Sequence, residues 1–109
     1  MKNHMGKVSL HLLKIICNQT DYIFFDEPEA ALSPQRQLTL LMEIAACARQ
    51  GSQFIIVTHS PILLGIPNAE ILLFDDGAIH TCEYEETESY MVTEMFINNR
   101  EQLLHRLFS

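Results

Sequence analysis

The stretch of sequence that decides the fold is YIFFDEPEAALSP, residues 22–34. It opens with four apolar residues, and two carboxylates, Asp26 and Glu27, follow them directly. A short continuous apolar run of this kind predicts a strand buried on both faces of a parallel sheet. Pro28 then turns the chain out of the strand, because proline has no N–H to donate to a sheet. We therefore expect both carboxylates at an edge of the sheet.

A helix is predicted to follow this strand. Ser33 is a good N-cap, and Pro34 suits the first helical turn, where no backbone N–H is needed. Gly51 is a suitable residue to end the helix. The residues expected on its apolar face are Leu38, Leu41, Met42, Ala45 and Ala48.

A second apolar run lies in FIIVTHSP, residues 54–61, and leads to His59. It predicts a second buried strand parallel to the first. Functional residues of α/β sheets collect at the carboxyl ends of such strands. We therefore expect Asp26, Glu27 and His59 at one edge of the sheet.

The remaining elements follow from periodicity and turn residues. The chain as a whole reads as one α/β domain, residues 1–109, with a layered, largely parallel sheet and C-terminal helices. The further predicted elements are a helix over residues 9–18, a short helix at 62–64, a hairpin of strands 71–74 and 78–83 around Asp76-Gly77, a solvated acidic run at 83–88, and helices at 89–98 and 100–108.

Composition restricts the function. A formal net charge of −7 argues against a broad nucleic-acid surface, because phosphate backbones attract Lys and Arg clusters. The three cysteines, Cys17, Cys47 and Cys82, are far apart and form no CxxC pair, which favours reduced thiols in a cytoplasmic protein over a zinc or redox site. The apolar stretches are short and broken by charge, so no transmembrane helix is expected.

The two carboxylates and His59 at the strand ends each have a functional and a structural interpretation. One carboxylate could hold Mg²⁺ and the other could orient or deprotonate a water, as nucleoside triphosphate hydrolysis requires. Acidic residues also commonly initiate turns. His59 could donate to a phosphate oxygen, or it could cap a neighbouring backbone group.

Residues 22–34 resemble the Walker B and D-loop segment of ABC-type ATPases, and residues 54–61 resemble their H-loop strand. The Asp-Glu-Pro-Glu and Thr-His-Ser-Pro forms are closer to the non-transporter branch, which includes SMC/RecF-type ATPases and bacterial predicted ATPases. Residues 86–108 are similar to the C-terminal helices of one such bacterial group. The resemblance implies a partial P-loop NTPase fold.

The resemblance also implies roles for individual residues. Asp26 would be the Walker B acid that supports Mg²⁺, Glu27 the base that polarises the attacking water, and His59 the switch histidine that senses the γ-phosphate. Ser33 would end the D-loop, residues 31–33, which meets an opposing protomer, and it is counted with Asp26 as a cofactor-binding candidate. Transporters usually carry Asp at the position of Ser33.

The family's phosphate-binding loop, GxxxxGK[ST], is absent from the sequence, and Gly6-Lys7 does not fit it. The signature motif, expected at residues 3–10, looks degenerate or truncated. We therefore expect a C-terminal part of an ABC-type core that binds ATP and Mg²⁺ in the complete protein but is inactive alone. Its partner would be the missing N-terminal part or a second protomer. The vacant strand position beside residues 54–57 would leave a gap or force different pairing, and an open edge favours self-association.

Two other functions remain open. The chain could be a non-catalytic binding or regulatory module that keeps the ATPase scaffold, or a stand-alone metal hydrolase. Intact Asp26 and Glu27 favour the ATPase, since a scaffold needs neither acid. The hydrolase ranks last, because two carboxylates and one histidine without a phosphate cradle make a thin site.

Overall fold

The structure is a computed structural model that describes residues 10–15 and 22–109. Its strands are β1 (Leu10–Ile15), β2 (Tyr22–Asp26), β3 (Gln53–Val57), β4 (Glu70–Asp75) and β5 (Ala78–Cys82). Its α-helices are α1 (Pro34–Arg49), α2 (Glu88–Asn98) and α3 (Arg100–Phe108). The shorter 3-10 helices are η2 (Pro28–Ala31), η3 (Leu63–Gly65) and η4 (Tyr84–Glu86). The predicted α/β class is confirmed.

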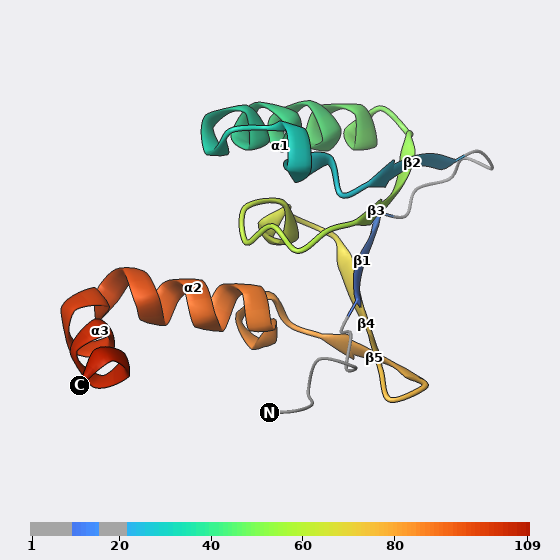
Figure 1. Cartoon of the computed structure of the whole chain (residues 1–109). Coiled ribbons are helices and arrows are strands. Elements are labelled where there is room, and N and C mark those ends of the chain that lie inside the picture. The colour runs from blue at the N-terminus through green and yellow to red at the C-terminus, as the bar shows by residue number, and fades with distance from the viewer. Residues whose placement is uncertain (1–9, 16–21) are drawn as a thin grey trace.

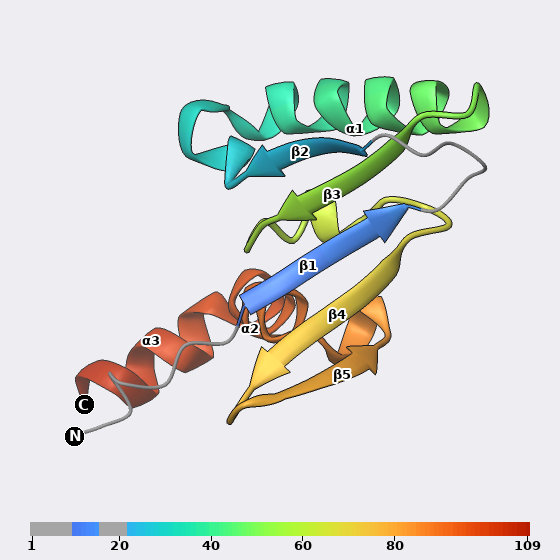
Figure 2. The same ribbon diagram turned by 90° about the vertical axis from the view of Figure 1, so that its right-hand side faces the viewer.

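The five strands form one sheet in the order β2-β3-β1-β4-β5 (Figure 2). Strand β2 pairs with β3 in parallel, whereas β1 is antiparallel to both β3 and β4, and β4 is antiparallel to β5. Strands β3 and β4 therefore run in the same direction with one strand between them. The prediction of a largely parallel sheet is correct for the β2–β3 pair and wrong for the other neighbouring pairs.

Strand β1 corrects the helix predicted over residues 9–18, of which residues 10–15 are described. This segment pairs with β3 from Leu12↔Val57 to Ile15↔Phe54, and with β4 from Leu10↔Phe74 to Lys14↔Glu70. Without it, the facing edges of β3 and β4 would lack partners for their backbone N–H and C=O groups, which costs free energy. Tertiary hydrogen bonding therefore outweighs a local helical pattern. The strand position expected to be vacant or differently paired is occupied by β1.

Strand β2 lies at the edge of the sheet, so the prediction that it is buried on both faces is wrong. Tyr22, Ile23 and Phe24 are all exposed, Phe24 by 59%. Phe25 alone packs against the core, where its ring stacks on Phe54 with centroids 6.2 Å apart. An apolar strand can thus lie at the edge of a sheet. In the part of the chain that the structure describes, no strand pairs with the outer edge of β2.

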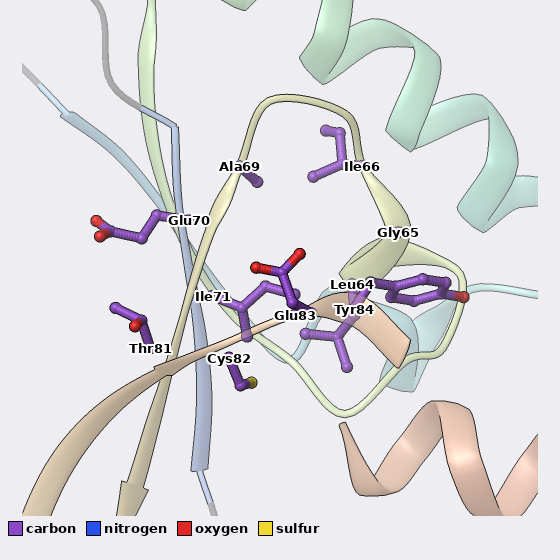
Figure 3. A pocket seen from close by; sticks show the side chains of 10 residues that line it. All are labelled: Leu64, Gly65, Ile66, Ala69, Glu70, Ile71, Thr81, Cys82, Glu83 and Tyr84. Atoms are coloured by element: carbon purple, nitrogen blue, oxygen red, sulfur yellow. The ribbon is translucent and has the colours of Figure 1, made fainter. Parts of the chain in front are cut away.

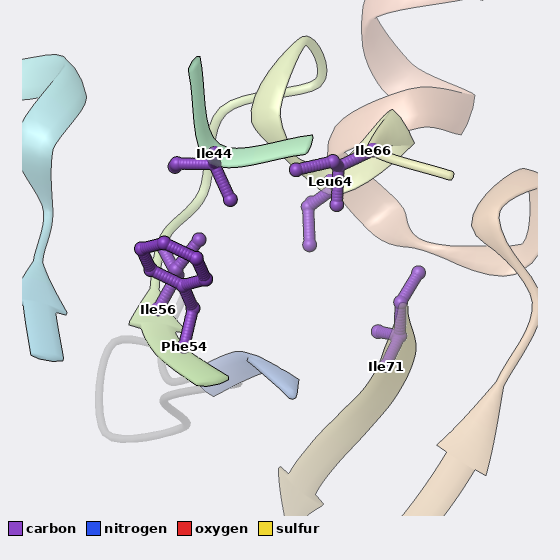
Figure 4. Packing of buried hydrophobic residues seen from close by; sticks show 6 residues of the cluster. All are labelled: Ile44, Phe54, Ile56, Leu64, Ile66 and Ile71. Atoms are coloured by element: carbon purple, nitrogen blue, oxygen red, sulfur yellow. The ribbon is translucent and has the colours of Figure 1, made fainter. Parts of the chain in front are cut away.

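The core lies between β3 and the elements on one face of the sheet (Figure 4). Helix α1 contributes Ile44, and Leu40, Leu41 and Ala48 pack beside it. The predicted apolar face is right at Leu41 and Ala48 but wrong at Leu38 and Met42, which is 68% exposed, because the buried stripe centres on Ile44. The six buried members are Ile44, Phe54, Ile56, Leu64, Ile66 and Ile71.

The predicted hairpin and the predicted start and end of α1 are confirmed. Asp76 and Gly77 both have positive φ, 52° and 78°, as the two-residue turn between β4 and β5 requires. Helix α1 starts after Ser33 and ends just before Gly51, whose φ is 108°. The acidic run at 83–88 is mostly exposed, although it contains η4 and the buried Thr87.

All described helices lie on one side of the sheet (Figure 1), and Figure 2 looks onto the side that none of them covers. The helices α2 and α3 bury none of their residues. Within the described residues, no helix has the length and apolar character needed to cross a membrane. The exposed large apolar residues of α2 and α3 are Met91, Val92, Met95, Phe96, Ile97, Leu107 and Phe108.

The strand assignment of β1 can be tested at Lys14, which lies between Ile55 and Glu70 in the register. We expect Lys14→Thr to be more stable than Lys14→Ala by up to about 1 kcal/mol, because threonine favours strands. Both variants remove the same charge, so the comparison isolates backbone preference. Chemical denaturation measures the difference. A higher stability for Lys14→Ala would indicate a helix, since alanine has the highest helix propensity.

Candidate functional site

The parallel pairing of β2 with β3 brings the predicted site residues to one edge of the sheet. Asp26, the last residue of β2, lies opposite Val57 in the register. The backbone N–H of Glu27 then donates to the carbonyl of Val57 at 2.7 Å, which extends the ladder by one bond. His59 follows two residues after Val57. The side chains of Asp26, Glu27 and His59 are all exposed.

Asp26 faces the side of the sheet that no described helix covers. Successive side chains of a strand alternate between faces, and its neighbour Phe25 packs into the core. The carboxylate of Asp26 is therefore directed away from α1. It is accessible to a ligand that approaches the open face at the carboxyl end of β2.

Glu27 adopts a left-handed backbone conformation, with φ 48° and ψ 56°. A non-glycine residue pays on the order of 1–2 kcal/mol for this conformation. It allows the chain to turn sharply from β2 into η2, whose first residue is Pro28. Such residues concentrate at functional sites, where the surrounding contacts hold them in place.

A polar network joins the segment after β2 to the segment after β3. The Thr58 hydroxyl donates to Glu29 Oε1 at 2.6 Å, and the backbone N–H of His59 donates to Glu29 Oε2 at 2.8 Å. The Ser60 hydroxyl donates to Gln37 Oε1 at 2.5 Å, and Gln37 Nε2 donates to the Leu32 carbonyl at 3.2 Å. These bonds fix the acidic turn, the start of α1 and the histidine segment to one another.

Ser33 is the N-cap of α1, as predicted. Its hydroxyl accepts a hydrogen bond from the backbone N–H of Arg36 at 3.2 Å. The side chain is exposed at the start of the helix. Its geometry is fully accounted for by capping, and a nucleotide contact by Ser33 stays a prediction.

A family model described as "AAA domain, putative AbiEii toxin, Type IV TA system" matches residues 7–65, more than half of the chain. The chain belongs to this family. The matched region contains Asp26, Glu27, Ser33 and His59, and it is of the P-loop NTPase type, so nucleotide binding is its class of function. No curated protein and no solved structure matches the chain.

Three residues of this AAA-domain site were not singled out from the sequence: Thr58, Ser60 and Gln37. Thr58 and Ser60 are buried on either side of the exposed His59. The Ser60 hydroxyl also accepts from the backbone N–H groups of Ile62 and Leu63, at 3.1 and 3.0 Å. The Thr-His-Ser order was a usable signal, because hydroxyls beside a strand end commonly bond the following backbone. Gln37 gave no such signal.

Metal binding at the edge of the sheet that carries Asp26, Glu27 and His59 would depend on few protein ligands. Among the described residues, no group of three or more His, Cys, Asp or Glu side chains converges to hold a metal ion. Mg²⁺ in nucleotide sites is usually bound by one or two carboxylates, substrate phosphates and waters. Asp26, exposed at the end of β2, fits that requirement.

A pocket of about 430 Å³ lies between η3, β4 and β5, away from the acidic edge (Figure 3). Its lining residues on the sheet come from the start of β4 and the end of β5, whereas Asp26 ends β2. Its lining includes Gly65, Cys82 and Tyr84, and a Cβ on Gly65 would meet the Tyr84 ring at 3.2 Å. Burial raises the pKa of the Cys82 thiol, and the carboxylates of Glu86 and Glu83 raise it further. Its position gives this pocket no part in phosphate chemistry at Asp26.

Removal of the Ser33 cap should destabilise the chain. We expect Ser33→Ala to lower the free energy of unfolding by about 0.5–2 kcal/mol, because the Arg36 N–H loses its acceptor. Ser33→Asp should retain most of the stability, since aspartate is an equally good cap. Thermal or chemical denaturation measures both variants. Equal stability of Ser33→Ala and the parent chain would contradict the capping role.

The raised pKa of Cys82 predicts slow alkylation in the folded chain, because the thiolate is the nucleophile. The pKa of Cys82 is higher in the folded chain than in the unfolded chain. The contribution of this thiol to folding stability is therefore fully present below the unfolded pKa, and it is lost as pH rises through the folded pKa. Iodoacetamide labelling followed by peptide mass spectrometry at rising pH measures the rates. Glu86→Gln should speed the reaction at Cys82. Equal rates at Cys82 in folded and denatured chain would contradict the shift.

Proposed function

We propose that this chain supplies the acid and histidine side of an ABC-type ATP-hydrolysing site, as the C-terminal part of such a core. Asp26 is the Walker B acid that supports Mg²⁺, Glu27 polarises the attacking water, and His59 senses the γ-phosphate. The observation that carries the proposal is the in-register parallel pairing of β2 with β3, which ends both strands at one edge. Nucleotide hydrolysis depends mainly on such positioning and on charge stabilisation.

Mg²⁺ bound with ATP would neutralise charge on the phosphates, and the protein residues have separate tasks. Asp26 offers an exposed carboxylate on the open face of the sheet. Glu27, held in its left-handed conformation, offers a second carboxylate one residue further along the turn. A water bound between Glu27 and the γ-phosphate would lose its proton to the Glu27 carboxylate.

The phosphate cradle belongs to another segment in this proposal, because the sequence contains no GxxxxGK[ST] motif. The complementary part is an N-terminal ATPase segment or a second protomer. Two features suit it: the face of the sheet that no described helix covers and the outer edge of β2. Ser33, at the start of α1, is the residue of the D-loop that would meet the opposing protomer.

A second candidate is a non-catalytic binding module. The large apolar residues exposed on β2 and on the two C-terminal helices favour it. Such a module would use the sheet edge or the helices α2 and α3 to associate with another protein. It would need neither acid, so removal of Asp26 or Glu27 would leave its binding unchanged.

The proposal is tested by adding Mn²⁺·ATP to the purified, isotopically labelled chain. Mn²⁺ substitutes for Mg²⁺ and broadens the NMR signals of nearby nuclei. We expect broadening confined to residues 26–33 and 58–60, with loss of the effect in Asp26→Asn. Asp75→Asn, which removes the carboxylate that ends β4, is the matched control and should keep it.

An ATPase assay on the same samples completes the test. We expect no turnover by the chain alone, because the phosphate cradle is absent. Turnover abolished by Glu27→Gln would mean that the chain forms a complete site and that the half-site proposal is wrong. Broadening that persists in Asp26→Asn would refute the nucleotide site at Asp26 and favour the binding module.

A further inference from the structure

The carboxylate of Glu29 binds the two residues that follow β3. Its two oxygens accept separately, Oε1 from the Thr58 hydroxyl at 2.6 Å and Oε2 from the backbone N–H of His59 at 2.8 Å. Glu29 is partly buried and Thr58 is fully buried. Hydrogen bonds to an ionised acceptor are roughly twice as strong as neutral ones, and partial burial reduces competition from water.

The Thr58 hydroxyl is fixed in its direction. It accepts from the backbone N–H of Ser60 at 3.0 Å while it donates to Glu29. The backbone N–H of His59, between them, also bonds Glu29. One carboxylate therefore holds the backbone on both sides of the histidine, although the imidazole itself is exposed.

Glu29 is fixed in turn by the same short helix that fixes Glu27. The carbonyl of Glu27 accepts from the Ala30 N–H, and the carbonyl of Glu29 accepts from the Leu32 N–H, both at 3.1 Å. This turn is therefore linked to Glu27 through the backbone and to His59 through the Glu29 side chain.

We propose that Glu29 is a positioning residue that holds His59 in a fixed relation to Glu27. The functional consequence of this inference rests on the proposed function. A displacement of Glu27 is transmitted to His59 through Glu29, and a displacement of His59 is transmitted to Glu27. Both oxygens of Glu29 are engaged by the two residues after β3, Thr58 and His59, so its role is to orient the histidine segment. The metal-binding carboxylate remains Asp26.

The contact is tested first without nucleotide. In Glu29→Ala, we expect the His59 amide to exchange its hydrogen at least about tenfold faster, because a hydrogen bond to a charged group is lost. The ¹⁵N order parameter of His59 should fall from the rigid value of about 0.85 toward the flexible value of about 0.6. The amide of Ile56, in the buried centre of β3, should be unchanged and reports that the fold is intact.

Matched variants separate the contact from general destabilisation. Thr58→Val removes the hydroxyl while keeping the side-chain shape, and Thr58→Ser restores it. We expect faster exchange and a lower order parameter at His59 in Thr58→Val, and rescue in Thr58→Ser. Unchanged His59 exchange in both Glu29→Ala and Thr58→Val would overturn the proposal, as would equal acceleration at Ile56.

Addition of Mn²⁺·ATP then separates this inference from the proposed function. In the parent chain, broadening at Glu27 and at His59 should occur together. In Glu29→Ala, we expect broadening to persist at Glu27 and to fall at His59. If the broadening persists in Asp26→Asn, the proposed function fails, while the exchange data still decide whether Glu29 holds His59. If Glu29→Ala broadens both residues as the parent chain does, the positioning role is wrong.

Discussion

The hydrogen bonds on both edges of β3 are the interaction on which the rest of the structure depends. This strand is more buried than β2, β4 or β5, with Ile56 fully enclosed, and its backbone needs a partner on each side. Strand β2 provides one partner in parallel register, and β1 provides the other in antiparallel register. The first pairing sets the positions of Asp26 and His59. The second closes the sheet between β3 and β4.

The sequence predicts the elements whose signals are local. Ser33 with Pro34 starts α1, Asp76-Gly77 makes the hairpin turn, and the apolar runs at 22–25 and 54–57 are strands, because caps, turns and short apolar runs act over a few residues. It fails for β1. The apolar pattern around residues 10–15 suits a helix, and only the two strands on either side, far along the chain, give it strand partners. Exposure of β2 is likewise a property of sheet order, which the strand's own residues do not encode.

The candidate site divides in the same way. The meeting of Asp26 and Glu27 with the histidine segment follows from a general rule about parallel strands, so it could be predicted. The contacts of Glu29 with Thr58 and of Gln37 with Ser60 could not. They join residues separated by 29 and 23 positions, and they depend on the register of β2 against β3 and on the turn at Glu27. Side-chain hydrogen bonds of this kind exist only after the strands are aligned.

The conformation of Glu27 bears on whether this edge is a site or a scaffold. Its left-handed backbone would be met at no steric cost by glycine, which populates positive φ readily. A chain that needed only to connect β2 with α1 would gain stability from glycine at this position. The chain carries glutamate here instead, at a cost of about 1–2 kcal/mol, while the Glu27–Val57 backbone bond and the Glu29 contacts hold the turn in place. Because the carboxylate of Glu27 is exposed, packing gives no reason for it, and this exposure favours the proposed role of Glu27 in chemistry at the carboxyl end of β2.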